Sequence, residues 1–211
     1  MKQKELFKKD SHIPFNYSPH SPHSIIFNTI KENTTILDIG CNSGLLGKEL
    51  LKKHVVSDGV DINPVLINQA KKYYRQTFIR NLYLPQLNIS PQKYDYIVLS
   101  DILEHLPRPD LLLLDLGQYL KKSGIIIVSL PNIARLEIRL QLLFGKFDYG
   151  KNGILSSDHL RFFTKKTAIQ MFQSVNCSVV NIIPTGLGHQ FPFLSDLLAF
   201  QFVFLLKSNH A

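Results

Sequence analysis

The stretch Ile36-Leu-Asp-Ile-Gly-Cys-Asn-Ser-Gly-Leu-Leu-Gly47 decides the fold of this 211-residue sequence. The apolar run 35–39 predicts a buried strand, and Gly40, Gly44 and Gly47 follow it as a glycine-rich turn. Such a turn lets a cofactor approach bare backbone, and the next helix offers unpaired N–H groups at its N-terminus. The stretch therefore predicts a strand, a cofactor loop and the start of a helix.

Apolar runs recur along the rest of the chain, with helical patterns between them. Strands are expected at 35–39, 55–60, 78–83, 94–99, 125–130, 179–183 and 200–206. Helices are expected at 44–53, 64–75, 110–122 and 165–175, with Gly124 ending the third of these. This alternation is typical of an α/β fold in which helices cover both faces of a parallel sheet. The last two strands lack a long crossover helix, so we expect them to pair antiparallel. The sequence thus predicts a single Rossmann-like, doubly wound, seven-stranded, mostly parallel sheet.

The chain length and the 45% hydrophobic content fit one domain. Residues 1–34 are expected to form an arm and a helix, because Ile25, Ile26 and Ile30 recur at helical spacing. The main domain then covers 35–211. Residues 132–164 break its rhythm with a helix to Leu143 and a glycine-rich loop, which predicts an insertion covering the site.

The composition predicts a cytoplasmic protein. Cys41 and Cys177 lie far apart, which fits neither a disulfide framework nor a zinc cluster. The charged N-terminus does not resemble a signal peptide. The apolar stretch 191–206 contains Asp196 and Gln201 and is shorter than the roughly 18 apolar residues of a spanning helix, so we interpret it as a helix running into a buried strand.

A formal net charge of +8 favours an anionic partner, such as a phosphorylated substrate, an acidic glycan, nucleic acid or a membrane surface. Part of that charge lies in Lys2, Lys4, Lys8 and Lys9, for which a solvated tail is the simplest interpretation. His12, His20 and His23 could bind a metal, but no cysteine accompanies them, so no metal site is predicted.

Two acidic residues make the cofactor loop more specific. Asp38 precedes the first glycine, where a carboxylate would repel a pyrophosphate but suit the ammonium and sulfonium groups of S-adenosylmethionine. Asp61 ends the second strand, about twenty residues downstream, where an acidic side chain can accept hydrogen bonds from ribose hydroxyls.

With these residues in place, the chain resembles the class I S-adenosylmethionine-dependent methyltransferases, in particular the group of quinone-biosynthesis, small-molecule and glycan methyltransferases. The resemblance runs from Ile36 to Thr164 and returns in the last strand. Its further segments are Tyr94-Asp-Tyr-Ile-Val-Leu-Ser-Asp-Ile-Leu-Glu-His-Leu-Pro-Arg-Pro109, Leu120-Lys-Lys-Ser-Gly-Ile-Ile-Ile-Val-Ser-Leu-Pro-Asn132, Gly145-Lys-Phe-Asp-Tyr-Gly150, His159-Leu-Arg-Phe-Phe-Thr164 and Phe200-Gln-Phe-Val-Phe-Leu-Leu206.

The resemblance implies a set of cofactor-binding residues: Asp38, Gly40, Cys41, Asn42, Gly44, Asp61, Ile62, Asn81 and Ser100. Gly40 and its neighbours would contact the methionine part, and Ser100 would lie beside the sulfonium. Two positions depart from the pattern. Asn42 replaces a common glycine, which the turn tolerates because asparagine can adopt a positive φ. Asn81 stands where an aspartate often binds the adenine amino group, and its carbonyl oxygen can accept instead.

Transfer of a methyl group from the sulfonium to a hydroxyl acceptor needs alignment of the two groups and a base that takes the hydroxyl proton. His105 follows Glu104 at the carboxyl end of the fourth strand, and His159 lies in the insertion, so these two histidines are the candidate bases. Each also has a purely structural interpretation. Asp101, Asn132 and Arg161 are expected on the substrate side, with Arg161 as an anion clamp or a partner of Asp158 in a loop salt bridge.

Several other functions compete with O-methylation of a small-molecule, lipid-linked or sugar acceptor. A nicotinamide oxidoreductase of the short-chain type would need a Tyr-x-x-x-Lys pair, which the sequence lacks. Nucleic-acid methylation usually shows Asn/Asp-Pro-Pro-aromatic after the fourth strand or a nucleophilic cysteine, whereas Ser100-Asp-Ile-Leu occupies that place and Cys41 lies in the cofactor loop. A non-catalytic cofactor-binding scaffold, an RNA or protein methyltransferase, and peripheral membrane contact stay open.

Overall fold

Helices and strands alternate along the chain, as the apolar runs predict. The computed structural model describes residues 14–84, 86–89 and 93–209. The strands are β1 (Thr35–Ile39), β2 (Val56–Asp61), β3 (Gln76–Ile79), β4 (Tyr94–Ser100), β5 (Leu120–Pro131), β6 (Cys177–Pro184) and β7 (Gln201–Ser208). The helices are α1 (Pro22–Thr29), α2 (Leu45–Leu50), α3 (Pro64–Ala70), α4 (Pro109–Leu116), α5 (Leu136–Leu143), α6 (Lys165–Ser174), α7 (Leu187–Gln190) and α8 (Ser195–Leu198), with 3₁₀ turns at Leu51–Lys53, Leu103–His105, Gly117–Tyr119 and Pro192–Leu194.

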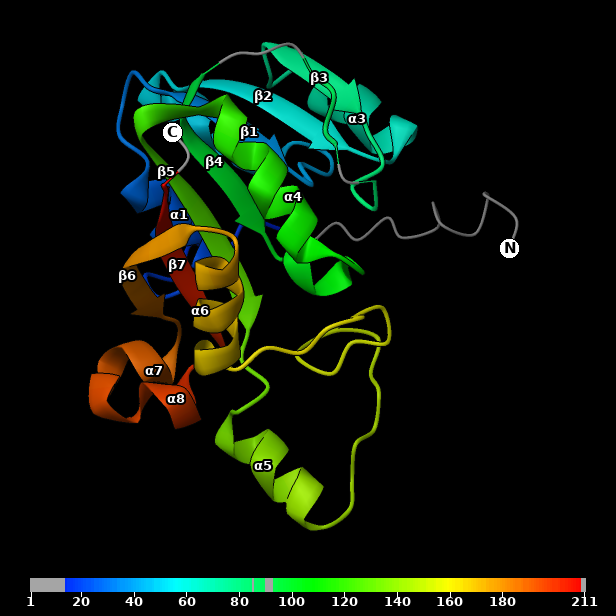
Figure 1. Ribbon diagram of the computed structural model, residues 1–211, viewed down its shortest axis with the longest axis vertical. Coiled ribbons are helices and arrows are strands. Elements are labelled where there is room, and N and C mark those ends of the chain that lie inside the picture. The colour runs from blue at the N-terminus through cyan, green and yellow to red at the C-terminus, as the bar shows by residue number, and fades with distance from the viewer. Residues whose placement is uncertain (1–13, 85, 90–92, 210–211) are drawn as a thin grey trace.

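The seven strands form one sheet in the order β3-β2-β1-β4-β5-β7-β6 (Figure 1). β1 pairs in parallel with both β2 and β4, and β4 pairs in parallel with β5. β7 is antiparallel to β5 and to β6, which confirms the expected pairing of the last two strands. β2 lies on one side of β1 and β4 lies on the other, so the direction in which strands are added to the sheet reverses at β1. Ligands of open α/β sheets bind outside the carboxyl ends of strands at such a switch point.

The sheet is covered on both faces, which confirms the doubly wound fold. One core packs Ile97, Leu99 and Phe204 of the sheet against α4 and α6, which lie in front of the sheet in Figure 1. The other packs alternate residues such as Ile36 and Val98 against α1 and α2. Successive strand residues therefore point to opposite faces, as a sheet between two helical layers requires.

Helix α1 belongs to the second of these cores. Ser21 caps it by accepting a hydrogen bond from the N–H of Ser24, and Pro22 occupies the first turn, where a missing N–H costs nothing. The isoleucines whose spacing predicts the helix are all buried: Ile25, Ile26 and Ile30. The part of the N-terminal region that the structure describes is thus packed against the domain. Lys2, Lys4, Lys8, Lys9 and His12 lie outside the described residues.

Several expected boundaries are wrong, including that of the helix expected over 64–75, which ends at Ala70. The third strand spans 76–79 instead of 78–83. The helix expected over 110–122 ends at Leu116, because β5 already begins at Leu120, which pairs with Tyr94; Gly124 therefore lies inside the strand and ends no helix. The stretch 191–206 contains no continuous helix before β7 but a 3₁₀ turn and the short α8, because Pro192 has no N–H to continue a helix.

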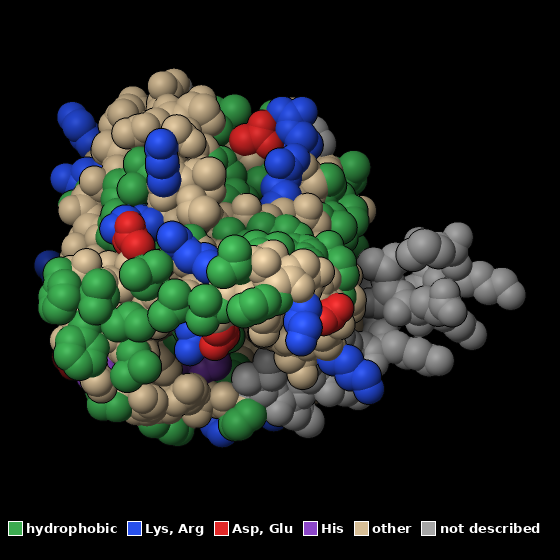
Figure 2. Space-filling view, turned by 90° about the horizontal axis from the view of Figure 1, so that it is seen from below, with side chains coloured by type: hydrophobic (Ala, Val, Ile, Leu, Met, Phe, Trp, Pro, Cys, Tyr) green, Lys and Arg blue, Asp and Glu red, His purple; other side chains and the backbone are tan. Residues whose placement is uncertain are grey.

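The insertion and the segment of α7 and α8 lie at one end of the molecule (Figure 1). Apolar side chains cover much of this end, with Lys and Arg among them (Figure 2). The exposed apolar side chains of the insertion include Leu140, Leu143, Phe144 and Tyr149, and Phe193 is exposed near α8. Among the described residues, no helix has the length and apolar character needed to span a membrane.

Candidate active site

The loop after β1 is shaped by residues with positive φ. Gly40 has φ of 76° and Gly44, which caps α2, has φ of 88°. Asn42 has φ of 50°, the positive value expected of an asparagine in place of glycine. The N–H groups of Gly40 and Cys41 both donate to the carbonyl oxygen of Val60, at 2.8 and 3.0 Å. A Cβ on Gly40 would lie 2.0 Å from Cδ1 of Ile102, so the Ile102 side chain packs directly against this glycine and leaves no room for a side chain there.

Asp61 at the end of β2 is held by the same loop. Its Oδ2 accepts the N–H of Asn42 at 2.9 Å and its Oδ1 accepts the N–H of Asn63 at 2.8 Å. Each oxygen keeps a second lone pair, so the carboxylate is fixed and can still accept two hydroxyl hydrogens. Asp61 lines a small cavity of about 160 Å³ together with Ile62 and Asn81, which fits the expected ribose and adenine contacts.

Asp38 lies at the carboxyl end of β1 and is almost fully buried. Its Oδ2 accepts the hydroxyl hydrogen of Tyr74 at 2.5 Å, and that hydroxyl accepts the N–H of Gly47 at 3.2 Å. Burial raises the pKa of Asp38 to about 7; the Tyr74 hydrogen bond opposes this rise, and the charge of Asp61 adds to it. A buried carboxylate with this pKa fits the ammonium group of S-adenosylmethionine, which would supply the missing positive charge.

Affinity for the cofactor should therefore depend on pH. Below about pH 7 Asp38 is protonated and neutral, so we expect affinity for S-adenosylhomocysteine to rise as the pH rises through 7, by up to about tenfold per unit. Titration calorimetry at pH 6, 7 and 8 measures this slope. Asp38→Asn should bind weakly and show little slope. If the variant keeps the wild-type slope, another group is responsible.

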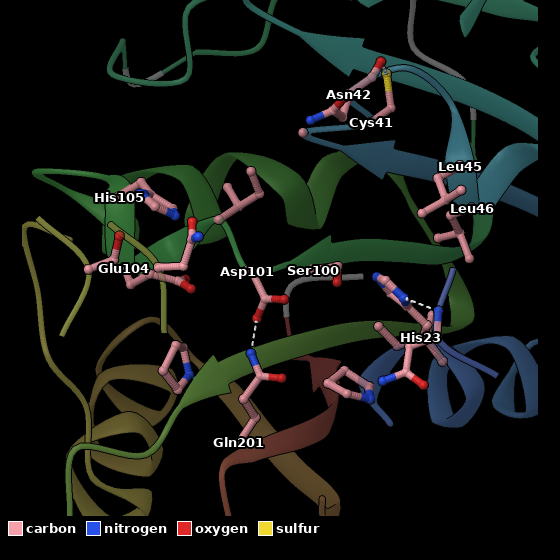
Figure 3. A pocket seen from close by; sticks show the side chains of 18 of the residues that line it. His23, Cys41, Asn42, Leu45, Leu46, Ser100, Asp101, Glu104, His105 and Gln201 are labelled. Carbon is pink, nitrogen blue, oxygen red and sulfur yellow. Dashed lines mark hydrogen bonds between the residues drawn. The ribbon is translucent and has the colours of Figure 1, made fainter. Parts of the chain in front are cut away.

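A larger cavity of about 580 Å³ adjoins the loop (Figure 3). Most of its lining comes from the segment before and in α1, the loop after β1, the turn after β4, and the insertion, and Asp61, Pro131, Phe200 and Gln201 also line it. Residues of these parts include Asn16 and His23; Asp38, Gly40, Cys41 and Asn42; Ser100, Asp101, Glu104 and His105; and Asn152, Ser156, Asp158 and His159. The insertion thus forms part of the cavity wall. Described lysine and arginine side chains do not contribute to the lining.

Asp101 stands between the cofactor loop and the insertion. It has φ of 54°, and its Oδ1 accepts hydrogen bonds from Oγ of Ser129 at 2.9 Å and Nε2 of Gln201 at 2.6 Å. Figure 3 shows Gln201 reaching across to it. Ser129 lies on β5 and Gln201 at the start of β7, so only the pairing of β5 with β7 brings them here. Sequence reasoning missed both supporting residues, because nothing local to them marks the contact.

His105 and His159 are brought together, with ring centroids 4.8 Å apart. Nδ1 of His105 lies 3.1 Å from the carbonyl oxygen of Asp158, and Nδ1 of His159 lies 2.9 Å from that of Ile154. A carbonyl oxygen can only accept, so in both rings Nδ1 carries the hydrogen and Nε2 keeps its lone pair when the ring is neutral. Burial lowers the pKa of His159, which favours that neutral form. Both histidines can therefore accept a proton at Nε2.

Glu104 is buried beneath these histidines. Its carboxylate oxygens have no hydrogen-bond partner among the described residues, and burial, reinforced by the charge of Asp101, raises the pKa of Glu104 well above its ordinary value. Its carbonyl oxygen accepts the N–H groups of Leu160 and Arg161, which ties the insertion to the turn after β4. One ligand atom each from Glu104, His105 and His159 lies within 4.8 Å of the other two, an arrangement that could hold a metal ion.

Two residues expected on the substrate side lie elsewhere. Asn132 is buried, and its amide donates to the carbonyl oxygens of Asp196 and Ala199, so it anchors the segment before β7. Arg161 donates through Nε to the carbonyl oxygen of Pro107. Neither residue lines the two cavities described above, which leaves the predicted anion clamp without support. The histidines of the N-terminal segment do not come together. His20 stacks on His189, whereas His23 lines the large cavity.

Comparison with known proteins identifies the family. The family model for a methyltransferase domain matches residues 19–182. A ubiquinone biosynthesis O-methyltransferase of Coxiella burnetii is 32% identical over 101 residues, which cover 46% of this chain and 43% of that protein, so the match spans less than half of the curated relative.

The fold is similar to those of solved SAM-dependent methyltransferases. One from Methanosarcina mazei superposes with a TM-score of 0.65 at 18% identity, covering 87% of this chain and 96% of its own. One from Aquifex aeolicus gives 0.62 at 13% identity, covering 96% and 95%. The domain match extends from helix α1 through the cofactor loop and the candidate bases to β6. This chain therefore belongs to the methyltransferase-domain family.

Proposed function

We propose that this methyltransferase takes the methyl group of S-adenosylmethionine and transfers it to a hydroxyl oxygen of a small molecule. One observation carries the choice of oxygen: His105 and His159 line the cavity beside the cofactor loop with Nε2 held as a proton acceptor. A hydroxyl acceptor must lose a proton during methylation, and a neutral imidazole is a suitable base at neutral pH.

The residues around the loop supply the cofactor's binding. Asp61 would hold the ribose hydroxyls, Asp38 the ammonium group, and the backbone at Gly40 would leave room for the methionine part. When bound, S-adenosylmethionine supplies an electrophilic methyl group. The chain's own contribution is to align the acceptor oxygen with that group and to remove the hydroxyl proton, and alignment alone can account for a large part of a rate enhancement.

The described lining of the large cavity offers no cationic side chain to a methyl acceptor. Asp38, Asp101 and Asp158 face it, whereas no described lysine or arginine does. An anionic acceptor, which the net charge of +8 favours, would find no countercharge there. The exposed apolar side chains of the insertion, such as Leu143 and Phe144, favour an acceptor with an apolar portion, including a lipid-linked one. The name of the Coxiella burnetii relative supports a phenolic or quinone-like acceptor.

The experiment is a transfer assay with methyl-labelled S-adenosylmethionine and three classes of acceptor: a catechol, a neutral sugar and an aromatic amine. We expect an O-methylated catechol as the main product. Transfer to the amine alone would contradict oxygen as the acceptor atom. Binding of S-adenosylhomocysteine without transfer to any of the three would favour a non-catalytic cofactor-binding scaffold, which is the second candidate function.

A further inference from the structure

His23 differs from the other two histidines of the large cavity. Its Nδ1 lies 3.0 Å from the backbone nitrogen of Asn16. A backbone N–H can only donate, so Nδ1 of His23 must accept and cannot carry a hydrogen. The hydrogen of the neutral ring is therefore on Nε2. The ring of Phe15 stacks on the imidazole with centroids 5.0 Å apart and planes inclined by 23°, which fixes its orientation.

The surroundings keep His23 in this neutral form. Burial lowers its pKa, although the negative charge of Asp101 partly opposes the shift. A proton on Nδ1 would also break the hydrogen bond from Asn16. Thus the backbone assigns opposite roles: His105 and His159 present a lone pair at Nε2, whereas His23 presents an N–H.

The N–H of His23 needs an acceptor. The side chain lies in the wall of the large cavity, near Leu46 and across from Asp101 (Figure 3). Within the described part of the chain, the bond from Asn16 is the ring's one hydrogen bond. An N–H donor in a partly buried, polar cavity is stabilised when a ligand supplies an oxygen, and most strongly when that oxygen is charged.

We propose that His23 is a ligand-binding residue that donates its Nε2 hydrogen to a carboxylate oxygen of the molecule in the large cavity. This inference rests on the proposed use of S-adenosylmethionine. Two sources could supply the carboxylate. The amino-acid end of the cofactor carries one next to the ammonium group assigned to Asp38, which lines the same cavity. The methyl acceptor could carry the other. In both cases a neutral donor binds the anion in a cavity without described cations.

The test compares two ligands that differ in this group. S-adenosylhomocysteine carries the carboxylate, whereas 5′-methylthioadenosine keeps the adenine, ribose and thioether but lacks the amino-acid end. His23→Asn is the variant of choice, because Oδ1 of asparagine can still accept the N–H of Asn16 while the Nε2 donor is lost. His20→Ala is the matched control, since His20 lies on the same segment and stacks on His189 instead of lining the cavity.

We expect His23→Asn to weaken binding of S-adenosylhomocysteine about tenfold or more in titration calorimetry, and to change binding of 5′-methylthioadenosine less than twofold. His20→Ala should bind both ligands like the wild type. Equal weakening of the two ligands would overturn the proposal, because His23 would then act only by holding the wall in place. Failure of the wild type to bind S-adenosylhomocysteine would instead contradict the proposed function.

A second experiment tests whether the methyl acceptor supplies the carboxylate. It measures binding of 3,4-dihydroxybenzoate and of catechol to the complex with S-adenosylhomocysteine. If His23→Asn leaves the first comparison unchanged but weakens dihydroxybenzoate relative to catechol, the carboxylate belongs to the acceptor and the proposal stands. If the first comparison does not depend on His23, and the second does not either or dihydroxybenzoate fails to bind in it, the proposal is wrong.

Discussion

Replacing Gly40 with alanine is expected to lower the affinity for S-adenosylhomocysteine about a hundredfold while the chain still folds. Two costs add at this position. The backbone has φ of 76°, a region unfavourable for residues with a Cβ, and the new Cβ would lie 2.0 Å from Cδ1 and 2.5 Å from Cγ1 of Ile102. Ile102 lines both cavities, so a shift of its side chain fills ligand space and a shift of the loop displaces the ligand's backbone partners. Overpacking of this kind costs about 1 to 3 kcal/mol.

Gly145→Ala is the matched control. Gly145 has a similar φ of 70°, but a Cβ there would meet nothing within 4 Å. It therefore reports the cost of the backbone conformation without the clash. Calorimetry measures the affinity, and thermal unfolding of both variants shows whether the fold is retained. If Gly40→Ala binds within about threefold of Gly145→Ala, the close approach at Ile102 does not determine cofactor binding.

The placement of the candidate cofactor-binding residues next to one another could be predicted because these residues are local in sequence. The loop follows β1 directly, and Asp61 ends the neighbouring strand. Parallel strands bring their carboxyl ends to one edge, so a strand, a turn and a second strand suffice to place Asp38 and Asp61 together. The pattern of residue types carries this information without knowledge of the rest of the fold.

The substrate half could not be predicted in the same way. Ser129 and Gln201 reach Asp101 only because β7 lies between β5 and β6 in the sheet. His23 reaches the large cavity only because α1 packs on the sheet. Asn132 shows the opposite error. It directly follows β5 in a segment typical of the family, yet its amide is used by Asp196 and Ala199. Chain position alone does not reveal which polar groups the backbone has already satisfied.

The two candidate bases give the last and largest expected effect. His105→Asn and His159→Asn each leave an amide that can donate to the carbonyl now bound by Nδ1, and each removes the Nε2 acceptor. We expect His159→Asn to slow single-turnover methyl transfer at least about tenfold, and the double variant to slow it by a factor of about 10² to 10⁴, the usual contribution of a general base. His159 is placed first because burial favours its neutral form.

The dependence of the rate on pH separates a base from a positioning group. Since burial lowers the pKa of His159 from 6.5, the wild-type rate at saturating cofactor should be level above pH 7 and fall only on the acidic side. At saturating cofactor concentration, protonation of Asp38 near pH 7 no longer changes the rate through cofactor binding. The double variant should be slow at every pH, and its rate should no longer decrease on the acidic side. If the double variant instead keeps the wild-type rate within about threefold, alignment of the acceptor suffices, and His105 and His159 serve to close the insertion over the cavity.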